Sequence, residues 1–112
     1  MDRTEPATVI STFRVSEGED QEFSALSRVH GSTLREQGFV TETPAPVIRG
    51  REASGASYFV EIFEWRGAAA VRTAHELPAV MAIREPMGAL CEARDGEPPM
   101  EFPHVEPVRL DP

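Results

Sequence analysis

The stretch "YFVEIFEW", residues 58–65, decides the fold of this chain. It is rich in β-branched and aromatic residues, and it predicts a strand whose successive side chains point to opposite faces of a sheet. Large apolar groups stand on both faces: Phe59, Phe63 and Trp65 beside Glu61 on one, and Tyr58, Val60 and Ile62 on the other. Both faces of the sheet must therefore be covered. Helices can cover one face, but the chain has too few elements for the other, so a second copy of the chain is the simplest cover.

The residues before this strand predict a strand, a helix and an edge strand. "TVISTFRV" (8–15) alternates and is rich in β-branched residues, which favours a strand. A helical period follows over 21–37 and stops at Gly38, as helices commonly do at a glycine. Its inward stripe comprises Phe23, Leu26, His30, Leu34 and Gln37. "FVTETPAPVIRGRE" (39–52) predicts an edge strand, because its prolines cannot donate to a central ladder.

The residues after it predict two helices and a last strand. "AAAVRTAHEL" (68–77) predicts a short helix, and Pro78 suits the first position of the next one, where its missing N–H costs nothing. The apolar stripe of that second helix comprises Val80, Ile83, Met87, Leu90 and Cys91. "MEFPHVEPV" (100–108) predicts a last extended segment, one face of which carries Met100, Phe102, His104 and Val108. The order β-α-β-β-α-α-β is that of a ferredoxin-like α+β unit.

Length and charge exclude several classes of protein. The 112 residues allow a single domain over 1–112, with a core at about 8–108. The 11 basic residues are all arginine and are scattered among 19 acidic ones, which argues against nucleic-acid binding. No apolar run approaches the roughly 18 residues of a membrane span, and the N-terminus lacks a signal-peptide pattern. We therefore expect a cytoplasmic protein, and the lysine-free, arginine- and proline-rich usage indicates a GC-rich bacterial genome.

Missing residue types and a single cysteine narrow the chemistry further. The chain has no lysine and no asparagine, which excludes a Schiff-base lysine and any mechanism built on an asparagine. Cys91 is the only cysteine, so no intrachain disulfide can form. Its place on the apolar stripe predicts a buried, inert thiol.

The pair His75-Glu76, in "TAHELPAVM" (73–81), raises the question of zinc. A zinc-protease helix needs a second histidine four positions after the first, so that both imidazoles share one face. Ala79 occupies that position, and Pro78 breaks the helix before it. We therefore expect no metal. A site assembled from the distant histidines 30, 75 and 104 is the alternative that the sequence leaves open.

His75 and Glu61 are the two candidates for catalysis. His75 follows Val71 by four positions and is predicted to face inward. An inward histidine needs a hydrogen-bond partner, and Glu61 is the scarce inward carboxylate in this sequence. Burial would push an unpaired Glu61 toward its neutral form. The two form either a structural pair or an acid/base pair, and we predict that His75 lies within hydrogen-bonding reach of a pocket carboxylate.

Four aromatic residues of the strand 58–65 are candidates for contact with a ligand. Phe59, Phe63 and Trp65 are either walls of a pocket or core residues. Tyr58 is either a hydrogen-bonding partner of a substrate or a packed strand tyrosine with a wet tip. The predicted pocket lies between this strand and the helix over 79–91.

Three charged or titratable residues complete the candidate ligand contacts. His30 is either a ligand contact or a hydrogen-bonded core histidine. His104 reaches either the pocket or the dimer seam. Arg84 is either an anion-binding arginine or a solvated charge on its helix.

The segment "EWRGAAAVRTAHELP" (64–78) has a tryptophan at a strand end, then alanines, then Ala-His and a proline. It resembles the signature of the antibiotic-biosynthesis-monooxygenase-like family, and the resemblance extends over 9–108. The resemblance implies that two sheets pack face to face into a homodimeric α/β barrel. It also implies that each protomer holds its own pocket between sheet and helices. This agrees with the independent argument that the strand 58–65 needs a partner.

The resemblance implies a chemistry as well. The named enzymes of the family are cofactor-free oxygenases of aromatic polyketides, in which a substrate carbanion reduces oxygen directly. No cofactor and a small hydrophobic or aromatic ligand are therefore expected. The family pattern has an asparagine four positions before the tryptophan that matches Trp65, whereas this chain has Glu61. A haem-degrading branch needs an asparagine, a tryptophan and a histidine together, so the lack of asparagine disfavours haem degradation.

Glu61 changes the expected chemistry. An asparagine amide can donate to a developing oxyanion, whereas a carboxylate repels it unless protonated. A carboxylate suits proton abstraction beside a carbonyl, with His75 as its partner. Three functions follow. The first is a cofactor-independent monooxygenase of an aromatic or polyketide-like substrate, with Glu61 or His75 as base. The second is a non-oxidative isomerase, cyclase or dehydratase that uses the same pair. The third is a dimeric ligand-binding or stress-response protein without turnover. The first is the family default.

Overall fold

The computed structural model of the chain describes residues 5–106, 108 and 110. Its elements are β1 (Ala7–Phe13), α1 (Asp20–Glu36), β2 (Val47–Arg51), β3 (Ser57–Trp65), α2 (Ala68–Glu76), α3 (Pro78–Ala89), β4 (Met100–Glu101) and β5 (His104–Val105). The predicted ferredoxin-like α+β order is confirmed, except that the last strand is divided into two. Pro107 of that predicted strand and both ends of the predicted domain 1–112 lie outside the described residues.

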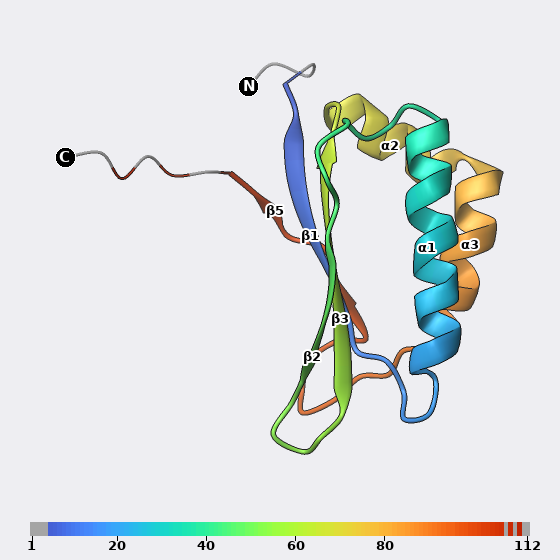
Figure 1. The fold of residues 1–112 in the computed structure, drawn as a ribbon, viewed down its shortest axis with the longest axis vertical. Coiled ribbons are helices and arrows are strands. Elements are labelled where there is room, and N and C mark those ends of the chain that lie inside the picture. The colour runs from blue at the N-terminus through green and yellow to red at the C-terminus, as the bar shows by residue number, and fades with distance from the viewer. Residues whose placement is uncertain (1–4, 107, 109, 111–112) are drawn as a thin grey trace.

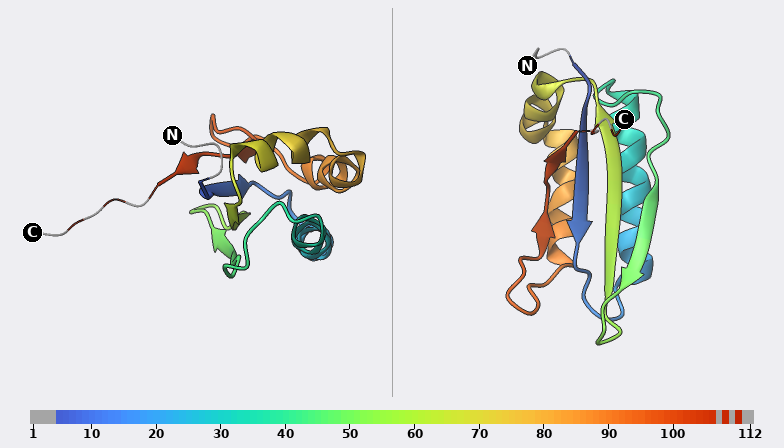
Figure 2. Two further views of the ribbon diagram at one scale, coloured as in Figure 1. Left: turned by 90° about the horizontal axis from the view of Figure 1, so that it is seen from above. Right: turned by 90° about the vertical axis from the view of Figure 1, so that its left-hand side faces the viewer.

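The strands form one antiparallel sheet in the order β2-β3-β1-β4, and β5 also pairs with β1. The two central strands run in register from the pair Ala7–Trp65 to the pair Phe13–Phe59. The three helices cover one face of the sheet (Figure 1). Seen from the other side, the strands stand in front of the helices, and no element of the described chain covers them (Figure 2). None of the helices within the described residues is long and apolar enough to cross a membrane.

Prolines decide where the outer strands begin and stop. β2 lies at the sheet edge as predicted, but it begins at Val47, just after the two prolines of the predicted strand over 39–52. Apart from β2, that predicted strand retains one isolated pairing, between Val40 and Trp65. Pro103 divides the last strand because it has no N–H to donate; its carbonyl accepts from the backbone N–H of Ile10 at 3.0 Å.

The helix-facing side of the sheet holds two apolar clusters with a polar layer between them. The first cluster comprises Val9, Leu34, Val40, Phe63, Trp65, Ala74 and Val80. The second comprises Phe13, Val15, Phe23, Phe59 and Met87. The layer between them, here called the polar belt, comprises Ser11, Ser27, His30 and Glu61, all buried. On each of β1, α1 and β3 the belt residues stand between residues of the two clusters, so the belt crosses the whole core.

The predicted helical stripes are confirmed in their central parts. α1 buries Phe23, Ser27, His30 and Leu34, whereas Gln37 is exposed because it lies at the C-cap, past the last helical residue. α3 begins at Pro78 as predicted and buries Val80 and Met87. Cys91 is half-buried and its Sγ donates to the carbonyl of Met87 at 3.3 Å. Burial raises the pKa of Cys91 to about 11, so the thiol is not a ready nucleophile near neutral pH.

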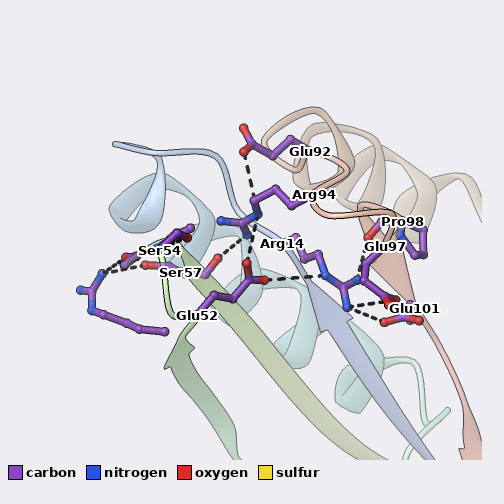
Figure 3. A network of polar contacts seen from close by, with 12 residues as sticks. Arg14, Glu52, Ser54, Ser57, Glu92, Arg94, Glu97, Pro98 and Glu101 are labelled. Carbon is purple, nitrogen blue, oxygen red and sulfur yellow. Dashed lines mark hydrogen bonds and ion pairs between the residues drawn. The ribbon is translucent and has the colours of Figure 1, made fainter.

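A polar network fastens the C-terminal segment to the sheet (Figure 3). Arg14, next to the end of β1, donates to the carbonyl of Pro98 at 2.7 Å and to Oε2 of Glu101 at 2.8 Å. Glu52, in the turn between β2 and β3, lies 3.8 Å from Arg14 and 3.9 Å from Arg94. These contacts hold β4 beside β1, and β4 and the residues after it form one wall of the cavity described next.

Candidate functional site

A cavity of about 380 Å³ lies between the helix-facing side of the sheet and the helices α2 and α3. This size falls within the roughly 300–1,000 Å³ that is usual for small-molecule sites. Its apolar walls are formed by Val9, Phe13, Phe63, Trp65, Val71, Met81, Met87, Met100 and Phe102. Its polar groups are Ser11, His30, His75, Arg84, Glu85 and His104. An apolar cavity with a few convergent polar groups is what the binding of a small molecule requires.

Six of the nine predicted site residues line this cavity: His30, Phe63, Trp65, His75, Arg84 and His104. They come from five different elements, which the fold brings together around one space. His104 reaches the cavity because β5 pairs it with Val9, and the inward side of β1 carries both Val9 and the belt residue Ser11.

The other three predicted residues lie elsewhere, and the predicted pocket is corrected accordingly. Tyr58 points to the uncovered face of the sheet, where its ring packs so closely on Gly50 that a Cβ there would collide with it. Phe59 faces the helices but belongs to the second apolar cluster, with its ring 4.9 Å from that of Phe23. Glu61 is 0% exposed and does not line the cavity.

A chain of side-chain contacts runs from the polar belt into the cavity. Ser27 donates its hydroxyl to Oε2 of Glu61 at 2.7 Å. Nδ1 of His30 lies 3.1 Å from Oε1 and 3.3 Å from Oε2 of the same carboxylate. On the other side of the ring, Arg84 donates Nε–H to Nε2 of His30 at 3.1 Å. Nη1 of Arg84 also lies 3.1 Å from Nδ1 of His75. One series of side-chain hydrogen bonds therefore joins α1, β3, α3 and α2.

The prediction that His75 hydrogen-bonds a pocket carboxylate is wrong. The buried histidine beside Glu61 is His30, and His75 is an exposed residue at the rim of the cavity whose hydrogen-bonding partner is Arg84. The reason is the rotation of α2: its fully buried residue is Ala74, so the next position along the helix turns away from the sheet.

Arg84 brings a positive charge to an apolar wall. The guanidinium carbon lies 5.9 Å from the centroid of the Trp65 ring, a cation–π arrangement. Burial lowers the pKa of Arg84, and the negative charge of Glu61 partly offsets this shift. Both hydrogen-bonding partners of Arg84 are imidazoles, and no carboxylate among residues 5–106, 108 and 110 forms an ion pair with it. Its charge thus lacks a direct counter-ion in the described chain.

The histidines do not form a metal site in the part of the chain that the structure describes. No group of three or more histidine, cysteine, aspartate or glutamate side chains gathers there in a way that could hold a metal ion. The pKa of His75 is lowered, first by the partial burial of its ring at the cavity rim and then by the charges of Arg84 and His104. Its ring is therefore neutral near pH 7 and can accept a proton.

Sequence reasoning missed the role of Ser27 and of the belt as a whole. The sequence nevertheless contains a sign of the belt, in the polar residues at positions predicted to face inward. Ser11 lies between the inward apolar residues of its strand, as Glu61 does on β3, and Ser27 and His30 interrupt the apolar stripe of α1. Inward polar residues at matching positions on three elements indicate a hydrogen-bonded layer, because buried polar groups need partners.

No family model matches the sequence, and no curated protein is similar to it in sequence. Solved structures do match over nearly the whole chain. SnoaB, a cofactor-independent oxygenase from Streptomyces nogalater, aligns with a TM-score of 0.70 and 18% identity over 96% of this chain and 98% of its own. A candidate antibiotic biosynthesis monooxygenase from Nitrosomonas europaea aligns with a TM-score of 0.71 and 9% identity, covering 98% of this chain and 97% of its own. Another candidate antibiotic biosynthesis monooxygenase, from Bordetella bronchiseptica, aligns with a TM-score of 0.71 and 11% identity. It covers 94% of this chain and 99% of its own.

These likenesses define the class of fold. The chain has the antibiotic-biosynthesis-monooxygenase-like fold, as the resemblance in sequence implied. At 9–18% identity the likeness extends to the fold and not to a particular reaction.

Proposed function

We propose that this chain is a cofactor-independent monooxygenase of a small aromatic substrate that can ionise to an oxyanion. The observation that carries the proposal is Arg84, a guanidinium beside the Trp65 ring on the wall of an apolar cavity, with only imidazoles as partners in the described chain. A planar anion entering the cavity would neutralise this charge beside apolar walls, where the attraction is stronger than in bulk water. The fold shared with SnoaB supports the proposal at the level of the scaffold.

His75 is the base that we propose for ionising the substrate. Its pKa is lowered, first by burial and then by Arg84, so the neutral ring is available near pH 7. An acidic C–H bond of the substrate breaks, the proton passes to Nδ1 of His75, and the electron pair stays on the substrate as a delocalised oxyanion. Nη1 of Arg84 then no longer has an acceptor on His75 and donates to that oxyanion instead. Glu61, which the sequence offered as an alternative base, lies behind His30 and outside the cavity.

Oxygen then reacts with the ionised substrate directly. The electron-rich carbanion reduces molecular oxygen and forms a bond to it. In the overall balance a CH₂ carbon loses two hydrogens and gains one oxygen atom as a carbonyl, and the second oxygen atom leaves as water. The protein supplies binding, ionisation and a cavity with apolar walls; the substrate supplies the electrons.

Oxygen consumption with a dihydroxyanthrone tests this proposal. We expect uptake of one oxygen molecule per anthrone oxidised, and we expect His75→Ala to lower the rate about 100-fold, the lower end for a lost general base. The rate should fall as the pH drops through the pKa of His75, which lies below its ordinary 6.5, because the protonated ring cannot accept the proton. Thr73→Ala, at an exposed position of the same helix, is the matched control and should keep the wild-type rate.

The same assay separates the two alternative functions. Turnover of a carbonyl substrate under nitrogen would indicate a non-oxidative isomerase or cyclase built on the same ionisation step. Binding of the anthrone without turnover in either atmosphere, and unchanged by His75→Ala, would indicate a ligand-binding protein. Either result would contradict the monooxygenase proposal. A cytoplasmic location and a bacterial source stay predictions from the sequence.

We also propose that the chain is a homodimer that packs the uncovered faces of two sheets together. That face carries Ile10, Ile48, Tyr58, Val60 and Ile62. Ile10 and Ile62 lie opposite each other on the two central strands, and the side chain of Ile48 on β2 is 53% exposed in the single chain. A contiguous apolar face of this kind on a sheet requires cover.

Ile62→Asp tests the dimer. Wild-type protein should sediment as a dimer at micromolar concentration, and Ile62→Asp should sediment as a monomer or fail to fold, because the carboxylate would be buried at the centre of the interface. Ser32→Asp, on the exposed side of α1, adds the same charge away from this face and should remain dimeric. A stable wild-type monomer at these concentrations would contradict the proposal.

A further inference from the structure

We infer that Ser27, Glu61 and His30 form a buried positioning relay, which fixes the tautomer of His30 so that Arg84 is held with its remaining N–H groups toward the ligand. The inference rests on the proposed function for its purpose, since it concerns the same cavity. It can be tested on the protein alone.

The first step is the cost of burying Glu61. Its carboxylate is fully buried, and an ionised carboxylate without partners in the core would be strongly destabilising. Ser27 donates to one oxygen at 2.7 Å, and Nδ1 of His30 lies 3.1 Å from the other. The carboxylate thus accepts hydrogen bonds from two residues of α1, and Arg84, one imidazole away, is the positive charge closest to it along the chain of contacts.

The second step assigns the protons of the His30 ring. A guanidinium has only donors, so Nε2 of His30, which lies 3.1 Å from Nε of Arg84, must present its lone pair. The proton of a neutral ring is then on Nδ1, and Nδ1 faces an acceptor, Glu61. Both contacts are satisfied by one tautomer and by no other. The same argument places the proton of His75 on Nε2, because its Nδ1 faces Arg84.

The third step explains why a glutamate stands where the resembled family has an asparagine. An ionised carboxylate can only accept, so it forces the proton of His30 onto Nδ1. An amide can turn either its oxygen or its NH₂ group toward the ring and would permit both tautomers. Only the tautomer with its proton on Nδ1 leaves the lone pair of Nε2 free to accept a hydrogen bond from Arg84. Glu61 therefore acts on the ligand through two intermediates, as a positioning residue.

Nitrogen NMR of the histidine rings tests the relay without a ligand. The chain has 3 histidines, so the signals can be assigned by substitution. In wild-type protein at neutral pH, His30 should carry its proton on Nδ1 with Nε2 unprotonated. In Glu61→Gln the other tautomer should appear. In Arg84→Met, where Glu61 still accepts from Nδ1, the wild-type tautomer should be retained. A wild-type His30 protonated on Nε2, or a folded Glu61→Gln protein that shows only the wild-type tautomer, would overturn the inference.

Binding of two matched probes shows whether the relay reaches the ligand. Naphthoate is an anion and naphthamide is its uncharged analogue. Glu61→Gln should weaken naphthoate binding about tenfold, the equivalent of one well-placed hydrogen bond, and should leave naphthamide binding unchanged. Equal loss for both probes, or for neither, would contradict the relay. Ser27→Ala provides a second, milder change if Glu61→Gln does not fold, and it should shift the naphthoate affinity in the same direction.

The two proposals fail in distinguishable ways. If the anthrone assay shows no oxygen uptake, the tautomer of His30 and the selective loss of naphthoate binding can still hold. If the NMR result fails while oxygen uptake depends on His75, the reaction stands and the relay does not.

Discussion

Arg84→Met should weaken the binding of naphthoate about 100-fold and lower anthrone oxidation at least as much, the scale observed when one donor to an oxyanion is removed. Methionine retains most of the apolar stem of arginine and removes its charge. The cavity should therefore keep its shape and lose its attraction for anions. Isothermal titration with naphthoate and naphthamide measures the effect, and the naphthamide affinity should change little.

The control for this substitution is Arg72→Met, at an exposed position of α2 outside the cavity lining. It removes the same charge from the protein and should leave both probes unaffected. Arg84→Lys should restore only part of the naphthoate affinity, because an ammonium lacks the planar set of donors that contacts both imidazoles. An Arg84→Met protein that binds naphthoate as wild type does would remove the observation on which the proposed function rests.

Phe23→Ala should lower the free energy of unfolding by about 3–5 kcal/mol, the usual range for a phenylalanine removed from a core. The ring of Phe23 is fully buried between those of Phe13 at 5.0 Å and Phe59 at 4.9 Å. It joins α1 to both central strands of the sheet. Truncation would leave a cavity that helix and strands, tied elsewhere by the polar belt, cannot readily close.

Urea denaturation at one fixed protein concentration measures this loss, because the stability of a dimer depends on concentration. Val29→Ala is the matched control, since Val29 lies on the same helix and is 50% exposed. Its effect should stay within about 0.5 kcal/mol, as for most surface substitutions. A loss below about 1 kcal/mol for Phe23→Ala would mean that the second apolar cluster repacks around the missing ring.

Much of the architecture followed from local patterns. The strand 58–65 alternates as predicted, and every second side chain from Ser57 to Trp65 is buried against the helices. Pro78 begins α3, and prolines limit the outer strands, because a missing N–H acts at its own position in the chain whatever the tertiary context. The lengths of the outer strands were less well predicted, because a proline interrupted each segment that was expected to be extended.

The sequence predicted the residues of the candidate site better than it predicted the contacts between them. His75 was paired with Glu61 on the basis of helical spacing from Val71, yet α2 is rotated so that Ala74 is its buried residue. A shift of one position along a helix turns a side chain by about 100°, and spacing within a short helix cannot set that rotation. The packing of α2 on the end of the sheet sets it.

The sequence by itself determined the order of the elements, the inward and outward faces of the strands, and the presence of a buried carboxylate at Glu61. These follow from the chemistry of residues that are near one another in the chain. The tertiary structure decided which side chains meet. Glu61 bonds Ser27 and His30 across 34 and 31 positions, and Arg84 meets His30 across 54. Such contacts depend on how α1 and α3 lie and rotate on the sheet, and that is settled by the packing of the whole core rather than by any local pattern.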